Sequence, residues 1–304
     1  MLTSLLSLYI TGIIDTNLGA QINTETVTDT HNIVRTASFD YQSISEATSI
    51  PVKDHAMVSP IINANGSIGV DLKTGGILFE KNPHERLPIA SITKLMTILI
   101  ILEENDLTET VKVSGNASTV GGSTMYLRTG ETISVKATLL GALVNSANDA
   151  ATALAEHNAG SVDEFVKKMN RKALSLGLVN TRFANPMGLD NPNNYSSAYD
   201  IAKLSKYIYQ KEFVRNAAIL RDVEVQSESG EYTHKLKSTN TLLGNEHYNV
   251  KGLKTGRTDG AGLCLVSVSE NNDGNEIITV VLGSPARFQE TKVLIDWIFR
   301  AYTW

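Results

Sequence analysis

The amino-acid sequence predicts a mixed α/β (α+β) fold, in which an antiparallel sheet is flanked by helices and an all-helical subdomain is inserted between its strands. Short apolar runs separated by turn residues occur early in the chain, at residues 67–79, and again late, at 261–282. Patterns typical of helices fill the region between them. Because the strands and helices do not alternate as βαβ units, the sheet is expected to be antiparallel.

The first hairpin and the first helices follow in order. Residues 67–79 alternate around Lys73-Thr74-Gly75-Gly76, which predicts two strands joined by a turn. Residues 95–102 are apolar on every side, which predicts a helix in the middle of the protein. Two further helices are expected at 134–144 and 149–157, with residues 145–148 as the junction between them.

The second half of the chain contains clearer boundary signals. Ser161 and Glu164 form a capping box that opens another helix, which Gly177 closes. A loop at 185–196 precedes a helix at 200–210. Turn residues then predict hairpins at 222–238 and at 261–282, and a last helix is expected at 288–302.

The first fifty residues are expected to lie outside the folded domain. Residues 1–14 are mostly apolar but shorter than the roughly 20 residues of a typical membrane-spanning helix, and they are similar to the apolar core of a secretion signal. Residues 15–50 are rich in Ser, Thr, Asn and Asp without a sustained period, which predicts a flexible tether. We therefore expect one folded domain at residues 51–304, with any membrane association through the N-terminal segment.

The composition excludes several classes of protein. Lys and Arg total 27 against 32 Asp and Glu, so the net charge of -5 argues against nucleic acid as a partner. The single cysteine, Cys264, excludes an intramolecular disulfide framework and a Cys-rich zinc site. Its apolar neighbours predict a buried, inert thiol.

Ser91 and Lys94 are the first candidates for chemistry. Their spacing places a hydroxyl and an amine on one face at the start of the apolar helix. A serine hydroxyl needs a base to become a nucleophile, and an amine can serve where burial or nearby positive charge favours its neutral form. A Ser-x-x-Lys sequence arises by chance about once in a chain of this length. On its own it would indicate only a helix cap and a surface lysine, so it needs partner motifs.

Two further motifs supply such partners. Ser-x-Asn occurs four times, but only Ser146-Ala147-Asn148 lies in a short break between two helices. Lys-Thr-Gly occurs twice, but only Lys254-Thr255-Gly256 enters an apolar strand where small residues let a ligand backbone approach. We interpret the other copies, which begin at Ser114, Ser238, Ser269 and Lys73, as turn, loop or strand-end residues, and keep Asn240 as a candidate groove residue.

In this order, the three motifs resemble the set found in penicillin-binding proteins and class A β-lactamases. The surrounding segments are similar to the D-alanyl-D-alanine carboxypeptidases among the low-molecular-mass penicillin-binding proteins; they are PIASITKLMT at 88–97, FANPMGLD at 183–190, TGRTDGAG at 255–262 and VLG at 281–283. The resemblance extends from about residue 56 to Trp304. It implies a β-lactamase/transpeptidase-like fold.

The resemblance also implies a serine acyl-transfer reaction that removes the terminal D-alanine from peptidoglycan stem peptides. Ser91 would attack the carbonyl between the two terminal D-alanines, with Lys94 as general base. Ser146 and Lys254 would pass a proton to the leaving amine. Water would then hydrolyse the acyl-enzyme, and β-lactam antibiotics would act as covalent inhibitors of Ser91.

Further roles follow from the same resemblance. Asn148 would bind the substrate amide, and Thr255 and Gly256 would lie along the substrate. The backbone N–H groups of Ser91 and Arg257 would form the oxyanion hole. Arg287 would either grip the substrate carboxylate with two hydrogen bonds or be a surface arginine that starts the last helix.

The resemblance implies no cofactor and no metal. The six histidines show no paired ligand spacing, so surface or structural roles are expected for them: His31, His55, His84, His157, His234 and His247. Because the substrate lies outside the cytoplasm, an exported protein of the cell envelope is expected. Many relatives continue into a β-rich domain and a terminal membrane anchor, but this chain ends at Trp304, so neither is expected.

Two alternatives remain open at the level of sequence. A class A β-lactamase shares the three motifs but activates its hydrolytic water with a loop glutamate that lies shortly before a Leu-Asn pair. This chain contains no Leu-Asn dipeptide, and its corresponding region is 185–190. A non-catalytic peptidoglycan-binding or β-lactam-sensing homologue would be expected to lack one of the motifs, and none is missing.

Overall fold

The computed structural model describes residues 50–244 and 249–304. The predicted signal-like segment at 1–14 lies outside the described residues, as does all of the predicted tether except Ile50. His31 and His247 lie outside them too. Within the described ranges, no helix is long and apolar enough to cross a membrane.

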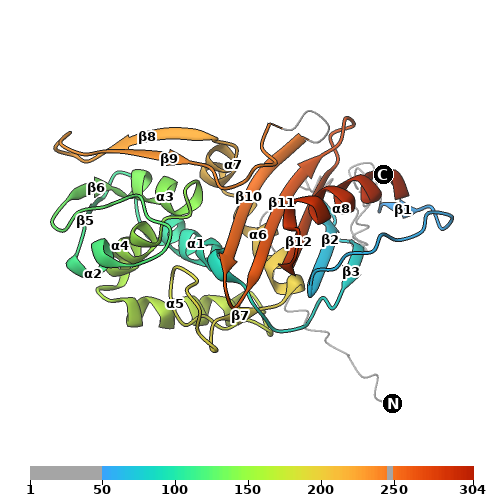
Figure 1. Cartoon of the computed structure of the whole chain (residues 1–304), viewed down its shortest axis with the longest axis horizontal. Coiled ribbons are helices and arrows are strands. Elements are labelled where there is room, and N and C mark those ends of the chain that lie inside the picture. The colour runs from blue at the N-terminus through green and yellow to red at the C-terminus, as the bar shows by residue number, and fades with distance from the viewer. Residues whose placement is uncertain (1–49, 245–248) are drawn as a thin grey trace, which may run out of the picture. The chain divides into compact units, whose positions relative to one another are not determined.

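A five-stranded antiparallel sheet forms the centre of the fold (Figure 1). Its strand order is β10-β11-β12-β2-β3, so strands from the two ends of the sequence meet where β12 pairs with β2. Because β10 has no partner on its other side within this sheet, it lies at the edge. The strands are β2 (Gly66–Asp71), β3 (Ile77–Lys81), β10 (Asn249–Thr258), β11 (Gly262–Glu270) and β12 (Glu276–Ser284).

Strand β12 shows how the sheet separates two layers of helices. Successive side chains of a strand point to opposite faces. Accordingly, Ile278, Val280 and Leu282 belong to the main core, which includes α1 (Lys94–Glu104) and α6 (Ala198–Tyr209). On the other face, Ile277 and Val281 pack in a smaller core with α8 (Arg287–Ala301). The sheet is therefore buried on both faces.

The inserted region between β3 and β10 contains the predicted helices. Besides α1 and α6 they include α3 (Val135–Leu143), α4 (Asn148–Ala159) and α5 (Val162–Ser175), which follow the short α2 (Gly115–Thr119) and the strand pair β5 (Thr110–Lys112) and β6 (Thr132–Ser134) in the sequence. Ser134 and Ser161 cap α3 and α5 by accepting hydrogen bonds from backbone N–H groups. Helix α1 contacts α3, α4, α5 and α6, which explains why its residues are apolar on every side.

The predicted hairpins and helices are confirmed, including the hairpin of β8 (Asp222–Gln226) and β9 (Thr233–Lys237). The sequence did not predict α2, α7 (Glu212–Ala218), the strand pair β5 and β6, or four strands of two residues each. These elements are too short to show a period. The two-residue strands include β4 (Leu87–Pro88), β7 (Tyr195–Ser196) and β1 (Val52–Lys53); β1 pairs with β13 (Tyr302–Thr303).

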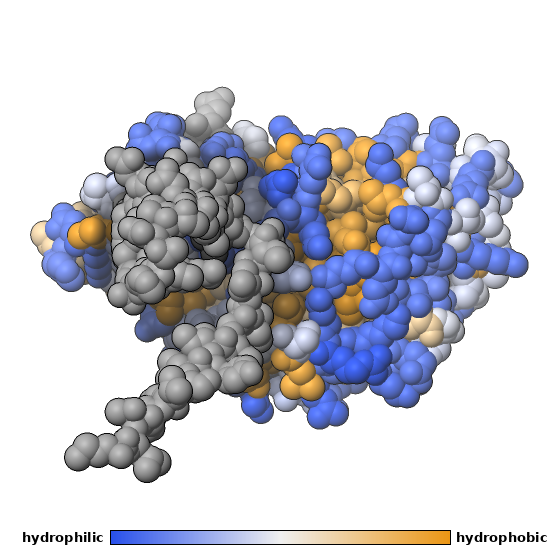
Figure 2. Space-filling view, turned by 180° about the vertical axis from the view of Figure 1, so that it is seen from behind, coloured by the Kyte–Doolittle hydropathy of each residue, from blue (hydrophilic) through white to orange (hydrophobic). Residues whose placement is uncertain are grey.

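Hydrophilic residues cover most of the described surface on the side opposite to that of Figure 1, and apolar residues are exposed in the middle of it (Figure 2). Apolar atoms make up roughly 55–60% of the surface of an ordinary folded protein. Exposed apolar atoms therefore do not by themselves indicate a binding surface.

Replacing Ile298 tests the packing of α8 on the sheet. Its side chain lies directly over Gly69 of β2, where an added Cβ would come within 2.4 Å of Ile298 Cδ1. Ile298 is fully buried, so Ile298→Ala should lower the free energy of unfolding by about 2–5 kcal/mol. Val293 on the same helix is 37% exposed, and Val293→Ala should cost less than about 1 kcal/mol in urea denaturation. Equal losses for the two variants would contradict this packing.

Candidate active site

Ser91 and Lys94 are positioned by a tight turn before α1. Residues Ala90–Thr93 form a 3₁₀ helix, and α1 begins at Lys94. Ala90 adopts a left-handed conformation (φ 47°), which a residue with a side chain holds only when its surroundings impose it. The turn brings Lys94 Nζ to 2.8 Å from Ser91 Oγ. Ser91 is partly exposed, whereas Lys94 is fully buried.

The Lys94 amine is surrounded by three oxygen atoms. Besides Ser91 Oγ, Asn148 Oδ1 and Met187 O each lie 2.7 Å from Nζ. These two carbonyl oxygens can only accept hydrogen bonds, so they take the two N–H groups of a neutral amine. The lone pair then faces the Ser91 hydroxyl. The arrangement suits a base that removes the serine proton.

Burial favours this neutral form of Lys94. Loss of hydration lowers the pKa of Lys94 well below its usual value, and the nearby charge of Lys254 lowers it further. The carboxylate of Asp149 acts in the opposite direction. Burial is the largest of the three effects, so the pKa of the Lys94 amine is lowered on balance.

Ser146 and Asn148 lie in the junction between α3 and α4. Ser146 has a left-handed backbone (φ 59°) and is almost fully buried. Asn148 is the first residue of α4, and its side-chain Nδ2 donates to Gly121 O at 2.7 Å. Its Oδ1 is held by Lys94, so the orientation of the amide is fixed from both ends. Among the described residues, no side-chain hydrogen bond is found for Ser146, which leaves its hydroxyl available to a ligand.

The edge strand β10 forms the opposite side of the site. An added Cβ at Gly256 would lie 3.0 Å from Ile89 O and 3.2 Å from Ser91 N, so glycine lets the strand approach the Ser91 turn. Lys254 is buried, and burial together with the charge of Arg287 lowers the pKa of Lys254 to about 7. Thr255 shares a hydrogen bond with the hydroxyl of Thr239.

Two arginines are next to this strand. Arg287, the first residue of α8, donates from Nη1 to Gly256 O at 2.6 Å. Its Nε is buried and has no hydrogen-bond partner in the described part of the chain. Arg257 is exposed at the rim. Arg287 is therefore partly buried beside the site.

These residues surround one cavity of about 400 Å³. Every predicted site residue except the two lysines lines it: Ser91, Ser146, Asn148, Thr255, Gly256, Arg257 and Arg287. Lys94 lies behind Ser91, and Lys254 is buried within β10. Residues separated by almost 200 positions in the sequence thus meet at one place.

The structure adds contributors that sequence reasoning did not assign. Met187 supplies its backbone oxygen to Lys94, and Gly188 packs so tightly that an added Cβ would lie 2.0 Å from Ala90 O. The loop is fixed by Asn185 Oδ1, which accepts from the N–H groups of Gly188 and Leu189. The FANPMGLD segment indicated that this loop belongs to the family pattern. It could not indicate the contact of Met187 O with Lys94, because every residue type has a backbone carbonyl.

Other predicted residues lie away from the chemistry. Asn240 is buried, and its Oδ1 accepts from the Leu242 N–H, so it does not line the cavity. Burial raises the pKa of the Cys264 thiol to about 11, as expected for an inert thiol. In the described ranges, no cluster of three or more His, Cys, Asp or Glu side chains is placed to hold a metal ion.

Comparison with known sequences identifies the family. The sequence pattern of the D-alanyl-D-alanine carboxypeptidase family matches residues 53–286. The chain belongs to this family. It is 37% identical to the D-alanyl-D-alanine carboxypeptidase DacF of Bacillus subtilis, over 79% of this chain and 63% of that protein. It is 32% identical to a D-alanyl-D-alanine endopeptidase of Pseudomonas aeruginosa, over 85% of this chain and 86% of that protein. The chain spans just under two thirds of the length of the first carboxypeptidase relatives.

Solved structures of a DD-transpeptidase and a penicillin-binding protein share the fold. The Streptomyces K15 DD-transpeptidase is 28% identical, with a TM-score of 0.75 over 80% of this chain and 99% of that chain. Penicillin-binding protein 5 from Haemophilus influenzae is 34% identical, with a TM-score of 0.74 over 80% of this chain and 72% of that chain. The predicted β-lactamase/transpeptidase-like fold is therefore confirmed.

The buried Lys254 predicts a pH-dependent stability for this carboxypeptidase-family domain. A lysine whose folded-state pKa is about 7 releases its proton on folding at any pH between that value and the unfolded pKa of about 10.4. The unfolded state then binds more protons, so stability rises with pH in this window. Lys254→Met should therefore stabilise the fold by on the order of 2–4 kcal/mol at pH 7, and the gain should shrink toward pH 10.

Urea denaturation at pH 7 and pH 10 measures this difference. Lys235→Met is the matched control, because the Lys235 side chain is 82% exposed and should show no gain that depends on pH. A gain for Lys254→Met that is equal at the two pH values would contradict the burial cost assigned to this amine.

Proposed function

We propose that the protein is a serine D-Ala-D-Ala carboxypeptidase that removes the terminal D-alanine from peptidoglycan stem peptides through an acyl-enzyme on Ser91. The main support is the environment of Lys94: a buried amine, hydrogen-bonded to two carbonyl oxygens, with its third neighbour the Ser91 hydroxyl. Family membership and the three motifs support the same reaction.

In the first step, Lys94 Nζ takes the Ser91 proton while Oγ attacks the carbonyl carbon between the two terminal D-alanines. The negative charge that develops on the carbonyl oxygen is stabilised by the backbone N–H groups of Ser91 and Arg257, each worth about 10²–10³ in rate. The C–N bond breaks as the proton that Lys94 took from Ser91 passes to the leaving nitrogen by way of Ser146 and Lys254, which returns Lys94 to its neutral form. D-alanine departs and leaves the ester on Ser91.

In the second step, water hydrolyses the ester. Lys94 accepts a proton from the attacking water, and the tetrahedral intermediate collapses by expelling Ser91 Oγ, which is reprotonated. The shortened peptide leaves with a free D-alanine carboxylate. The reaction needs only side chains and backbone groups of this chain together with water.

Substrate binding uses the edge strand and the positive charges. An extended peptide can pair along β10, whose outer side is free of strand partners within the central sheet. Asn148 would hydrogen-bond the peptide amide. The terminal carboxylate would lie near Thr255 and Arg287, where Arg287 Nε lacks a partner in the described chain. Its negative charge would compensate the positive charges gathered at this end of the cavity.

The substrate class also suggests where the protein works. Stem peptides lie outside the cytoplasm, so we propose an exported enzyme of the cell envelope that acts on cell-wall peptidoglycan. Any association with the membrane would come through the apolar residues 1–14. β-Lactam antibiotics, which carry a reactive amide and a carboxylate, would acylate Ser91 and inhibit the enzyme.

A β-lactamase activity is a weaker alternative. Among the described residues that line the cavity, none is a glutamate that could activate water as in class A β-lactamases. The adduct of a β-lactam on Ser91 should therefore turn over slowly. Rapid hydrolysis of nitrocefin without a detectable adduct in the mass spectrum would favour the β-lactamase instead.

Endopeptidase activity is a second candidate because the P. aeruginosa relative, which matches over most of its own length, is named an endopeptidase. The chemistry at Ser91 would be the same, and only the group on the leaving amine would differ. Release of D-alanine from a pentapeptide and cleavage of a cross-linked dimer, measured side by side, separate the two activities.

Ser91→Ala tests the nucleophile. The variant should lose all covalent labelling by a fluorescent penicillin and all release of D-alanine from diacetyl-Lys-D-Ala-D-Ala, because alanine has no oxygen to form the ester. Its melting temperature should stay close to that of the wild type, and Ser175→Ala, an exposed serine, should label normally. Residual labelling of Ser91→Ala would refute the assignment. A labelled wild type that releases no D-alanine would favour a β-lactam-sensing or peptidoglycan-binding protein.

Arg287→Met tests carboxylate recognition. If Arg287 binds the terminal carboxylate, the variant should lose about 10-fold or more in kcat/KM for a peptide acid. A peptide with a C-terminal carboxamide should be a poor substrate of both proteins, with little further loss in the variant. Equal losses for the acid and the amide would show that Arg287 acts only through its hydrogen bond to Gly256 O.

A further inference from the structure

A second polar cluster lies behind the wall of the cavity that contains Asn148. The backing segment, residues 121–131, runs between α2 and β6. Its first part is bonded to the Ser146-x-Asn148 junction: Gly121 O accepts from Asn148 Nδ2, and Ser123 O accepts from Asn148 N, both at 2.7 Å. An added Cβ at Gly122 would lie 2.6 Å from Asn148 Nδ2. The position of this segment therefore sets the orientation of the Asn148 amide.

The later part of the backing segment is fixed by Asp149. The buried carboxylate accepts from the backbone N–H groups of Met125 and Leu127, at 3.0–3.1 Å. These two peptides flank Tyr126, which has a left-handed backbone (φ 65°) and an 82% exposed side chain. A residue with a side chain holds this conformation only when neighbouring contacts impose it. The hydrogen bonds on either side of Tyr126 provide that constraint.

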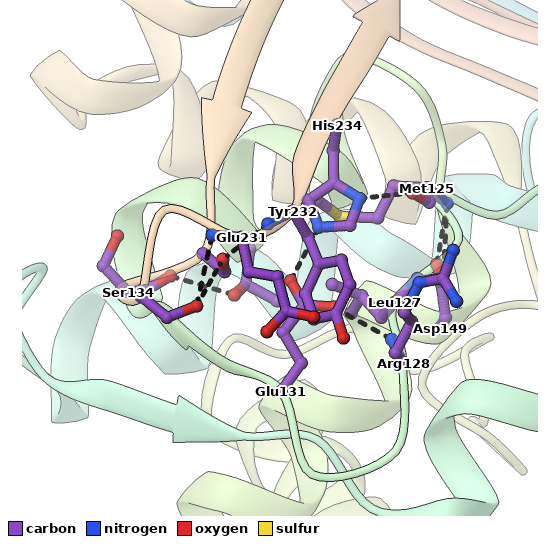
Figure 3. Close-up of polar contacts among 12 residues, drawn as sticks. Met125, Leu127, Arg128, Glu131, Ser134, Asp149, Glu231, Tyr232 and His234 are labelled. Atoms are coloured by element: carbon purple, nitrogen blue, oxygen red, sulfur yellow. Dashed lines mark hydrogen bonds and ion pairs between the residues drawn. The ribbon is translucent and has the colours of Figure 1, made fainter.

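His234, on β9, contacts Met125 through the carbonyl group of that residue (Figure 3). Its Nδ1 lies 2.8 Å from Met125 O, and its Nε2 lies 2.6 Å from Glu131 Oε1. Because a carbonyl oxygen only accepts, Nδ1 bears the hydrogen of the first contact. The other oxygen of Glu131 accepts from Arg128 N. Thus Met125 is bonded through its N–H to Asp149 and through its C=O to His234.

The hairpin that contains His234 has other attachments to the inserted region. At its tip, Glu228 N donates to Thr132 O, and Thr110 Oγ1 donates to Glu228 Oε1. Docking of the hairpin therefore does not depend on a buried imidazole. A buried polar pair that is not needed for docking is expected to fix a particular geometry, here the path of residues 121–131.

We propose that His234, supported by Glu131, is a positioning residue for acylation, which holds Met125 O and thereby the segment that orients the Asn148 amide toward Lys94 and the substrate. Without the imidazole, Met125 O loses its donor and the backing segment can shift. Asn148, whose side-chain Nδ2 donates to Gly121 O and whose backbone N–H donates to Ser123 O, shifts with it, and Lys94 loses one of its two carbonyl acceptors. The inference rests on the proposed acylation of Ser91.

Three substitutions separate this role from simple structural support. His234→Leu removes both side-chain contacts of the ring, whereas His234→Asn keeps an N–H at the place of Nδ1. Lys235→Leu changes the adjacent residue, which is exposed, and serves as the control. With a fluorescent penicillin, the second-order acylation rate should fall about 10-fold or more for His234→Leu, fall less than about 3-fold for His234→Asn, and stay unchanged for Lys235→Leu.

A double-mutant cycle with Asn148 identifies the route. If His234 acts through the Asn148 amide, His234→Leu should reduce acylation less than about 2-fold when Asn148→Ala is already present. The same fold-loss in both backgrounds would overturn the proposal, as would a folded His234→Leu variant with an unchanged rate. Labelling of the wild type at Ser91, mapped by mass spectrometry, tests the proposed function separately, because its absence would remove Ser91 as the nucleophile whatever His234 does.

Glu131→Gln provides an independent variant if His234→Leu does not fold, as judged by circular dichroism. Glutamine keeps the size of the side chain but removes the carboxylate that faces Nε2. Glu131→Gln should lower the acylation rate by about 3-fold or more. As with His234→Leu, this loss should be smaller when Asn148→Ala is already present. An unchanged rate in this variant, or a loss that is independent of Asn148, would contradict the positioning role.

Discussion

The structure depends on the burial of one amine beside one hydroxyl. Lys94 is fully enclosed, and loss of hydration is the largest cause of its lowered pKa. A charged ammonium is costly in such surroundings, while a neutral amine that donates two hydrogen bonds is not. Much of the surrounding architecture maintains this enclosure. Helix α1 is covered by four helices, the loop at Met187 covers the amine, and Gly256 lets β10 close against the turn.

The same burial explains the electrostatics of the cavity. Lys94, Lys254 and Arg287 lie near one another, and each of the two lysines has its pKa lowered by a neighbouring positive charge as well as by burial. A ligand with a carboxylate supplies the negative charge that this arrangement lacks. The peptide acid we propose as substrate and a β-lactam both have one, which connects the proposed reaction with the proposed inhibition.

Rigid elements of the fold hold the reactive side chains in place around the cavity. Ser91 lies on a 3₁₀ turn ahead of a buried helix. Ser146 has a left-handed backbone between two helices, and Lys254 lies on an edge strand. The segment at 121–131 connects the Asn148 amide to the β8–β9 hairpin, because its backbone carbonyls accept hydrogen bonds from the side chains of Asn148 and His234. The helical region therefore does more than cover the sheet, because it sets the position of polar groups on one side of the cavity.

Much of this could be predicted from the sequence. Turn residues predict the hairpins, and the capping box at Ser161 predicts the start of a helix, because both signals are local. Ser91, Lys94, Ser146, Asn148 and Lys254 stand in motifs of distinct residue types. No motif indicates three other contacts of the site: Met187 O with Lys94, Asn148 with Gly121 O, and His234 with Met125 O. Any residue has a carbonyl group, and His234 is 109 positions from its partner. The sequence by itself determined which side chains can do the chemistry; only tertiary packing decided which backbone groups hold them, because those contacts depend on spatial proximity and not on residue type.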